Sequence, residues 1–424
     1  MGSQYRVNFH KPVAMKPYYR LLFLGCLCGA FLLMAPLCPA AAAPDSSWVP
    51  TRPDTDANTR KGFEHFYELD YDKAIRDFEA AQQAHPDDPF AVNHVLAAVT
   101  FKELSRIGAL DTESYAGDTF MNKKAVVPLD PAVRDRVQQL TAQSLALSQA
   151  KLDKNANDVN AIYARGATRA LESTYVGLGE KSWFAALRIA VAARRDNERV
   201  LELDPKYVDA KVGIGTDLYI VGSLSWPAKV AASVVGLSGN KQKGLDYLRQ
   251  ATASNHVEVA TDAKIMLALF LRREQKYAEV LQLVNSMTSE YPRNFIMAAE
   301  YAHLLNAAGH GQEAIAAYRK VIAGCRNNVY NQCRIAIPAF GLGESLRGQK
   351  EYADAAEAYE LAAGSAKDDP NLQQRATLAA GEMYDLLQKR DTALEKYKAV
   401  IAENSTSNSA DLARHYLKQA YTSP

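Results

Sequence analysis

The sequence predicts an all-α protein made of repeated antiparallel helix pairs around an enlarged, irregular centre. Hydrophobic residues make up 48% of the 424-residue chain and charged residues 23%, a balance that fits two or three folded domains or one long repeat array. The 23 glycines and 17 prolines are too few for a collagen-like or disordered chain. The net charge of +1 argues against a general nucleic-acid binder. Small and large residues also recur at fixed offsets, which is typical of helical repeats.

Residues 1–42 are expected to be an export signal. Four basic residues, with no Asp or Glu, accompany an apolar run from Leu21 to Leu37, and Ala40 and Ala42 form an A-x-A cleavage pattern. Cleavage after Ala42 is favoured, because cleavage one residue later would leave a proline at the first mature position. Loss of residues 1–42 changes the net charge from +1 to −3, because the segment carries four positive and no negative charges. The mature chain is then expected in the periplasm or outside the cell.

Two alternatives for this leader remain open. The apolar run from Leu21 to Leu37 is just long enough to cross a bilayer, so the leader could stay uncleaved as an anchor. Lipid modification is the other alternative, although Cys26 precedes most of the apolar run and Cys38 follows a leucine where a small residue is wanted.

Cys325 and Cys333 are the two cysteines left in the mature chain, and they are predicted to form a disulfide. Exported proteins meet an oxidising environment, and one pair of cysteines eight residues apart fits one bridge. The alternative is a pair of free, buried thiols.

One residue pattern recurs five times along the chain. In the first copy Gly62 is followed by Ala74, then by Phe78 four positions on and by Ala81 three positions after that. The small residues let two helices approach closely, and the large residue fills the gap to the next pair. Four-then-three spacing keeps these side chains on one helical face. The other copies begin at Ala268, Ala302, Gly343 and Gly381.

This pattern resembles that of the tetratricopeptide repeat (TPR) family, whose helix pairs repeat about every 34 residues. Val280 and Ala314 occupy equivalent positions one such repeat apart, and the resemblance covers residues 56–88 and 260–405. It implies a TPR-type α-solenoid, a right-handed superhelix of antiparallel helix pairs, with a concave groove that binds another protein or a peptide.

Two copies of the repeat are longer than the family's usual length. Ala314 and Ala355 are seven positions further apart than one repeat, and the surplus lies around Cys325 to Cys333. The predicted disulfide is therefore expected to hold an enlarged turn between repeats. Ala355 and Ala393 are four positions further apart than one repeat, with the surplus near positions 367–370.

The chain is expected to divide into six segments. They are the signal peptide (1–42), an extended N-terminal segment (43–55), a TPR-like helix pair (56–88), irregular and extended helix pairs (89–258), a regular TPR array (259–405) and a C-terminal capping helix (406–424). Pro86 and Pro292 end second helices, because proline cannot donate the next backbone hydrogen bond.

The irregular centre is expected to be helical as well. Gly166 and Ala193 correspond to the first two repeat positions but lie much further apart than Gly62 and Ala74, which indicates an insertion of roughly four helical turns. Ser182 is the expected N-cap of the last of the helices predicted there. These helices are Asp87–Leu110, Pro131–Lys154, Asn157–Leu178 and Ser182–Leu203, with a loop at Gly117–Pro131.

The segment Gly213 to Leu248 is the most distinctive in the chain. Its glycines, with a Ser-x-x-Pro element between them, resemble a stretch of a eukaryotic TPR family associated with the mitochondrial outer membrane and with inclusion clearance. The likeness implies shape more than function. Val221 to Leu237 is apolar enough for membrane contact, and the favoured alternative is a helix pair inserted into the core of the neighbouring repeat.

The mature sequence carries none of the catalytic signatures sought in it. H-E-x-x-H, G-x-S-x-G, Walker and C-x-x-C motifs do not occur. The lone G-x-G pairs that begin at Gly177, Gly213 and Gly341 are interpreted as close packing points between helices. Histidines are scattered, with no two at i and i+4 on one helix. We therefore expect a non-enzymatic protein with no cofactor and no metal.

The concave groove is where binding is expected, through side chains of the first helices. Arginine and amide side chains there resemble those with which some TPR modules hold a peptide carboxylate. Arg272 and Arg347 are expected to be exposed, so that alanine in their place would leave folding nearly unchanged. The alternative is an ordinary solvated face. The predicted groove residues are Arg272, Arg273, His303, Asn306, Phe340, Arg347 and Arg375.

Two functions follow from these observations. The first is an exported, non-enzymatic TPR scaffold for a protein or peptide partner, with no nucleic acid bound. The second is a carrier that holds a hydrophobic small molecule or lipid in the enlarged centre, with Trp183, Phe184, Tyr219 and Trp226 around the pocket. The identity of the partner and the oligomeric state are not encoded in these patterns.

Overall fold

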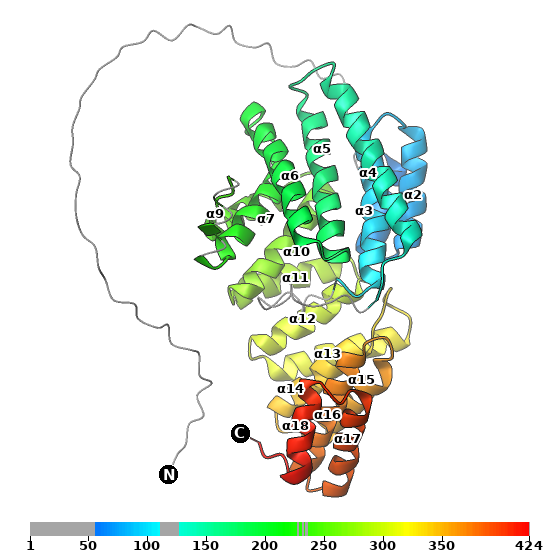
Figure 1. Cartoon of the computed structure of the whole chain (residues 1–424), viewed down its shortest axis with the longest axis vertical. Coiled ribbons are helices and arrows are strands. Elements are labelled where there is room, and N and C mark those ends of the chain that lie inside the picture. Colours follow the sequence, from blue (N-terminus) through cyan, green and yellow to red (C-terminus); the bar gives the residue numbers. More distant parts are fainter. Residues whose placement is uncertain (1–55, 111–126, 227–228, 231–232, 234–235, 424) are drawn as a thin grey trace, which may run out of the picture.

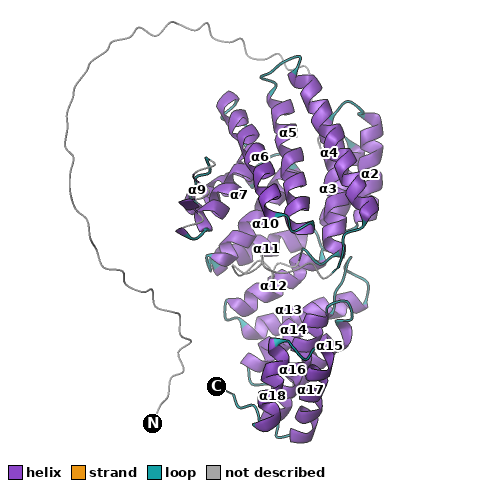
Figure 2. Cartoon of the chain, viewed as in Figure 1, coloured by secondary structure: helices purple, strands orange, loops and turns teal. Residues whose placement is uncertain are grey.

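The computed structural model describes residues 56–110, 127–226, 229–230, 233 and 236–423. The predicted leader and cleavage site lie outside these residues. Within them the regular structure is helical, as predicted (Figure 2). The exception is an isolated β-bridge between Asn294 and Asn331. The helices are α1 (Ala57–Tyr67), α2 (Tyr71–Ala84), α3 (Pro89–Arg106), α4 (Pro131–Leu152), α5 (Val159–Thr174), the π-helical turn η3 (Tyr175–Gly179), α6 (Trp183–Leu203), α7 (Ala210–Ser223), α9 (Lys241–Ala251), α10 (Val257–Arg273), α11 (Tyr277–Glu290), α12 (Phe295–Ala307), α13 (Gly311–Arg326), α14 (Ala336–Gly348), α15 (Tyr352–Ser365), α16 (Pro370–Leu386), α17 (Arg390–Glu403) and α18 (Asn408–Lys418).

Short polar side chains start several of these helices. Asp88 and Asp130 each accept a hydrogen bond from the backbone N–H two residues on, and a proline follows each at the first helical position. The expectation that Ser182 caps α6 is wrong. Its ψ of 70° falls short of the 112° and 120° at the two aspartates, and its side chain makes no capping hydrogen bond.

Consecutive helices pack against each other along the chain, so the array is built from pairs. Contacts that skip one helix join first helices to first helices: α1 to α3, α3 to α5, α7 to α10, α12 to α14, α14 to α16 and α16 to α18. First helices therefore lie next to each other within three stretches: α1 to α5, α7 with α10, and α12 to α18. In Figure 1, α3 to α7 stand in the upper half of the view and α13 to α18 in the lower half, with α10 to α12 between them.

The five predicted copies of the repeat are confirmed by their packing. Each of the small and large repeat positions is buried. A Cβ atom built on Gly62 would lie 2.3 Å from the ring of Phe78, and one on Gly343 would lie 2.6 Å from the ring of Tyr359. Glycine at these positions is what allows the aromatic ring of the second helix to lie directly on the backbone of the first.

The irregular centre is also built from pairs of packed helices, and several of these helices are longer than those of the regular repeats. Gly166 lies against α6, where its Cβ would be 3.5 Å from the carbonyl oxygen of Ala193, so the expected partner of Gly166 is confirmed. The backbones of α7 and α9 approach at Gly215 and Gly244, where a Cβ on either residue would lie less than 3.0 Å from the other's carbonyl oxygen. The interpretation of the central glycines as packing points is confirmed here.

The first helix pair packs back against helices that follow much later in the chain. The hydroxyl of Tyr67 lies 2.9 Å from both the carbonyl oxygen of Glu258 and Oδ1 of Asp262 on α10. Nδ2 of Asn294, which begins α12, donates to the carbonyl oxygen of Tyr67 at 2.6 Å. The ring of Tyr67 also lies 5.2 Å from that of Tyr291. The array therefore closes on itself between α1 and the α10–α12 region.

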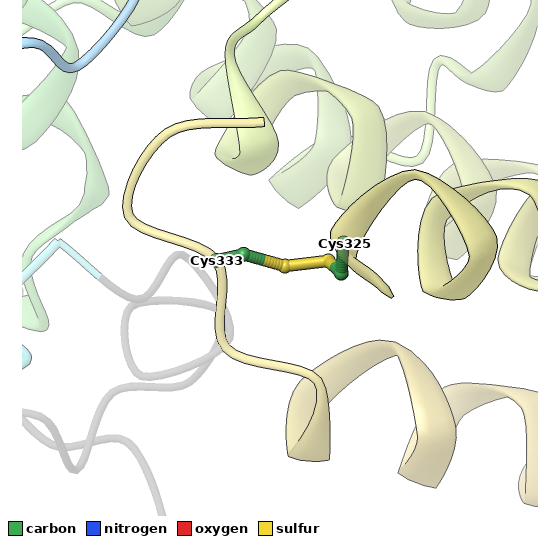
Figure 3. Close-up of a disulfide and its surroundings, with 2 residues drawn as sticks. All are labelled: Cys325 and Cys333. Carbon is green, nitrogen blue, oxygen red and sulfur yellow. A yellow bond between two sulfur atoms is a disulfide. The ribbon is translucent and has the colours of Figure 1, made fainter. Parts of the chain in front are cut away.

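Cys325 and Cys333 form the predicted disulfide, with Cα atoms 5.8 Å apart. It joins the end of α13 to the loop that follows (Figure 3). Residues 327–335 are named the disulfide loop. Asn331 in this loop donates from Nδ2 to the carbonyl oxygen of Glu68 at 2.9 Å, so the loop also holds the turn between α1 and α2. Its role extends beyond the enlarged turn between repeats that the sequence predicts.

Part of the apolar segment from Val221 to Leu237 lies outside the described residues. Its two ends are buried and pack with Val191 and Leu224, whereas Trp226 is largely exposed. No helix in the described part of the chain is both long enough and apolar enough to span a bilayer.

Candidate functional site

A cavity of about 260 Å³ lies where α12 and α14 meet the end of α3. We call it the concave pocket. Apart from Tyr318 on α13, it is formed by first helices, by the residues just after α3 and by the disulfide loop with its continuation into α14. The lining residues are Ser105, Gly108, Leu110, Arg272, Phe295, Ile296, Ala299, Glu300, His303, Asn306, Tyr318, Gln332, Arg334, Ile337, Phe340, Gly341, Glu344 and Arg375.

One side of the concave pocket combines an aromatic ring with an arginine. The guanidinium carbon of Arg375, on α16, lies 4.7 Å from the centre of the Phe340 ring, a distance at which the ring face attracts a cation. Phe340 in turn packs edge-on against the buried ring of Tyr359, 5.5 Å away. The hydroxyl of Tyr359 donates to Oε1 of Glu344 at 2.5 Å, and burial raises the pKa of this tyrosine. Tyr359, the large residue of its repeat copy, therefore holds the Phe340 ring in place at the edge of the pocket.

The helices α10 and α12 bring to the pocket an ion pair that is largely shielded from water. Nη1 of Arg272 lies 3.0 and 2.9 Å from the two carboxylate oxygens of Glu300, and Nη2 lies 2.8 Å from Nε2 of His303. The side chains of Arg272 and Glu300 are only 11% and 13% exposed. The expectation that Arg272 is exposed is therefore wrong. Alanine in its place would leave the carboxylate of Glu300 without this countercharge, so folding would not stay unchanged.

Arg334 brings a third arginine to the concave pocket from the disulfide loop. Its Nη2 donates to the carbonyl oxygen of Ser105 at 2.5 Å, which links the loop to the end of α3. A guanidinium carries five N–H donors, so this bond uses only one of them. Three arginines and two glutamates line the pocket, and its balance of formal charge is positive.

Five of the seven predicted groove residues line the concave pocket, and two do not. Arg272, His303, Asn306, Phe340 and Arg375 line it.

Arg273 and Arg347 are not among the lining residues. Successive residues on a helix point about 100° apart, so two adjacent arginines on α10 do not face one groove. Arg347 is engaged elsewhere: Nη1 lies 3.1 Å from Oε2 of Glu382, and Nη2 donates to the hydroxyl of Tyr421 at 2.6 Å. Its side chain is partly buried in these contacts, so the expectation that Arg347 is exposed is wrong.

Arg334, Ser105 and Gly108 are pocket residues that the repeat pattern does not identify. Arg334 and Ser105 are 229 residues apart, so no local spacing reports their meeting. The one signal in the sequence is the surplus of residues between Ala314 and Ala355, which is the disulfide loop that carries Arg334.

The side chains expected around a carrier pocket do not enclose one together. Tyr219 is buried, with its ring stacked 3.8 Å from that of Phe270 and its hydroxyl donating to Glu274 at 2.8 Å. Phe184 and Trp226 point into solvent over most of their surface. Among the described residues, Tyr219 is packed inside the helix core while Phe184 and Trp226 are exposed, so these three side chains do not surround one shared pocket.

The described residues thus form an all-α solenoid of TPR type whose first helices line a positively charged pocket. No protein-family model matches the chain, and no curated protein sequence matches it. Among solved structures, the chain is similar to the Cut9–Hcn1 hetero-tetramer of APC/C, with a TM-score of 0.46 and 12% identity over 87% of this chain. The chain spans 56% of that relative's length.

Two further solved structures are similar over most of both chains. Yeast Tom70 has a TM-score of 0.35 and 12% identity, covering 87% of this chain and 88% of its own. A human IFIT1 dimer with m7Gppp-AAAA has a TM-score of 0.41 and 11% identity, covering 88% of each chain.

Proposed function

We propose that the chain is an exported, non-enzymatic scaffold that binds an extended segment of another protein in the concave pocket. One observation carries the proposal. First helices from both halves of the array, together with the disulfide loop, bring an aromatic ring and three arginines to one pocket. Stacked helix pairs use such surfaces for peptides.

The size and charge of the pocket indicate the chemistry of its ligand. A cavity of about 260 Å³ is smaller than the roughly 300–1,000 Å³ of sites for drug-sized ligands, and it suits a single side chain or a chain terminus. Arginine binds both oxygens of a carboxylate in a fork. The ligand group proposed for Arg334 and Arg375 is therefore an acidic side chain or the terminal carboxylate of the partner.

Export is part of the same proposal. The basic and apolar leader in residues 1–42 supports it. The disulfide between Cys325 and Cys333 also supports it, because such bonds persist in oxidising compartments outside the cytosol. N-terminal sequencing of the exported protein tests this part: we expect the mature chain to begin at Ala43, and an intact leader in the membrane fraction would replace the exported scaffold by an anchored one.

Peptide binding is tested with a library of acidic peptides, each made with a free and with an amidated C terminus. Fluorescence anisotropy should find members that bind the mature chain and that bind Arg375→Ala at least tenfold more weakly, at about 1.4 kcal/mol per tenfold. The effect should decrease as salt rises, because surface charges are screened over about 8 to 10 Å. Arg319→Ala is the matched control, since Arg319 is an exposed arginine on α13 outside the pocket. Equal binding by wild type and Arg375→Ala would contradict the proposal that the peptide binds in the concave pocket.

A further inference from the structure

The chain's C-terminal segment folds back onto the first helices of the last two regular repeats. α18 ends at Lys418, and residues 419–423, named the tail, continue without helical structure. The backbone N–H of Tyr421 donates to Oδ2 of Asp385 on α16 at 2.8 Å. The hydroxyl of Tyr421 accepts from Nη2 of Arg347 on α14 at 2.6 Å, and the guanidinium carbon lies 5.5 Å from the centre of its ring. One tail residue is thus held by its backbone, its hydroxyl and its ring face.

The surface that receives Tyr421 combines the partly buried Arg347 with two deeply buried carboxyl groups. The side chain of Asp385 is fully buried and also accepts from Tyr397 and Arg390. Glu382, the ion-pair partner of Arg347, is 9% exposed. Charged groups this deeply buried are costly unless they are paired, and both have partners outside the tail: Asp385 has Arg390 and Tyr397, and Glu382 has Arg347. We call Arg347, Glu382 and Asp385 the tail site.

The tail site continues the concave surface that carries the pocket. Arg347 lies one helical turn beyond Glu344 on α14, and Glu344 lines the pocket. α14 and α16, which supply the tail site, are also the helices that supply Phe340 and Arg375. An extended chain that leaves the pocket along these first helices would therefore meet the tail site next.

We propose that the tail site is a second subsite for an extended partner segment that carries a tyrosine, and that Tyr421 occupies it until the partner arrives. This proposal rests on the peptide-binding function proposed above and adds an occupant to it. The chemistry that holds Tyr421 is one backbone N–H and one phenol, which any extended tyrosine-containing segment presents. A tyrosine offers a large contact area at a small cost in side-chain freedom.

The tail competes with such a segment from within the same molecule. A short tether places its tyrosine at an effective concentration of about millimolar beside the tail site. A peptide in solution must displace it, so removing the tail should strengthen binding of an added tyrosine peptide. The structure thereby assigns the tail a regulatory effect on the groove as well as a position in the fold.

The experiment uses a fluorescent peptide of residues 418–423, Lys-Gln-Ala-Tyr-Thr-Ser, with an amidated C terminus so that it carries no carboxylate for the concave pocket. Its binding is measured by anisotropy to the full mature chain and to a chain that ends at Gln419. We expect at least tenfold tighter binding to the shortened chain, and at least tenfold weaker binding of the same peptide with Tyr421→Ala. Arg347→Lys in the shortened chain should also weaken binding, because lysine lacks the planar fork.

Circular dichroism and thermal melting show that the shortened chain is folded. If it is not, the full-length Tyr421→Ala chain replaces it, because its tail keeps its length but loses its phenol. Equal binding to the chains with and without Tyr421, or equal binding of the tyrosine and alanine peptides, would overturn the proposal. The concave pocket is tested separately with the acidic peptides that have free C termini. If those peptides do not bind while the amidated tyrosine peptide does, the proposed pocket is contradicted and the tail site is still supported.

Discussion

At the scale of single residues, the repeat is decided by contacts between a small residue and a ring at a fixed offset on the next helix. Gly343 and Tyr359, like Gly62 and Phe78, are such a pair. These positions could be predicted because close helix packing needs a small residue at that offset, and the offset is local in sequence. The groove arginines could not be assigned in the same way, since Arg272 is fixed by Glu300 on another pair.

Gly343→Ala should lower the free energy of unfolding by about 1 to 3 kcal/mol. The added methyl would lie 2.6 Å from the ring of Tyr359, which must shift, and this outweighs the gain of up to about 1 kcal/mol in helix propensity. Gly364→Ala is the matched control, because nothing lies within 4 Å of its added Cβ and the site is exposed. Urea denaturation checks both; a destabilisation of similar size in the two variants would contradict the packing argument.

Glu382 should make stability depend on pH. Burial raises its pKa from the ordinary 4.5 to about 7, with Glu344 acting in the same direction and Arg347 opposing it. The folded chain therefore holds this proton over a range in which the unfolded chain has lost it. The resulting stability is fully present below about pH 4.5 and is lost as pH rises to about 7.

Denaturation at pH 5 and pH 8 measures this effect. The free energy of unfolding should fall by about 1 to 3 kcal/mol more in wild type than in Glu382→Gln over that interval. The comparison uses the change with pH, because the substitution also removes a partner of Arg347 at every pH. An identical pH dependence in the two proteins would show that Glu382 does not titrate in this range.

At the scale of elements, the disulfide loop departs from the regular repeat and joins helix pairs that lie far apart in the sequence. Its extra residues were visible in the sequence as one copy that is seven positions too long. The contacts of these residues could not be predicted from the sequence, because Asn331 and Glu68, which form a hydrogen bond, are 263 residues apart. Arg334 of the same loop bonds to Ser105 and lines the concave pocket. A turn that is long for its repeat is therefore used to connect distant pairs and to supply a binding residue.

Removing the disulfide should cost stability and pocket order together. Closing a loop of about nine residues contributes roughly 2 to 3 kcal/mol in the chain-entropy model, so Cys325→Ala with Cys333→Ala should lose about that much. Acidic-peptide affinity should fall in the double variant as well, since Arg334 would no longer be held beside Ser105. Thiol titration of the unfolded, unreduced mature protein should find no free thiol, and two free thiols would refute the bridge.

At the scale of the whole molecule, the first helix pair closes on the α10–α12 region. The helix pairs were predictable one by one, because each is specified by residues within it. The packing of the first pair against α10–α12 could not be predicted, because it depends on how many pairs stack and on where the enlarged centre places those pairs. Asn294 shows the result: its side chain accepts from the N–H of Met297 as the cap of α12 and donates to the carbonyl oxygen of Tyr67.

Asn294→Ala should therefore cost more than the loss of a cap. We expect a loss of about 2 to 3 kcal/mol in the free energy of unfolding, from one N-cap and one buried hydrogen bond to Tyr67. Asn240→Ala is the control, because the side chain of Asn240 also caps its helix, α9, by accepting from the backbone N–H three residues on, and Asn240 is exposed; it should lose about 1 kcal/mol. Equal losses would mean that the closure contributes nothing beyond the cap.

The central claim is that a partner's segment lies in the concave pocket, and site-specific photo-crosslinking in the native cell tests it most directly. A photoreactive phenylalanine analogue is placed at Phe340, which lines the pocket, and at Lys398, which is exposed on the second helix α17. The account predicts a crosslink from position 340, absent at 398, to an acidic or C-terminal segment of another protein, and its loss in the Arg375→Ala background. A crosslink that forms at 398 and not at 340 would contradict it.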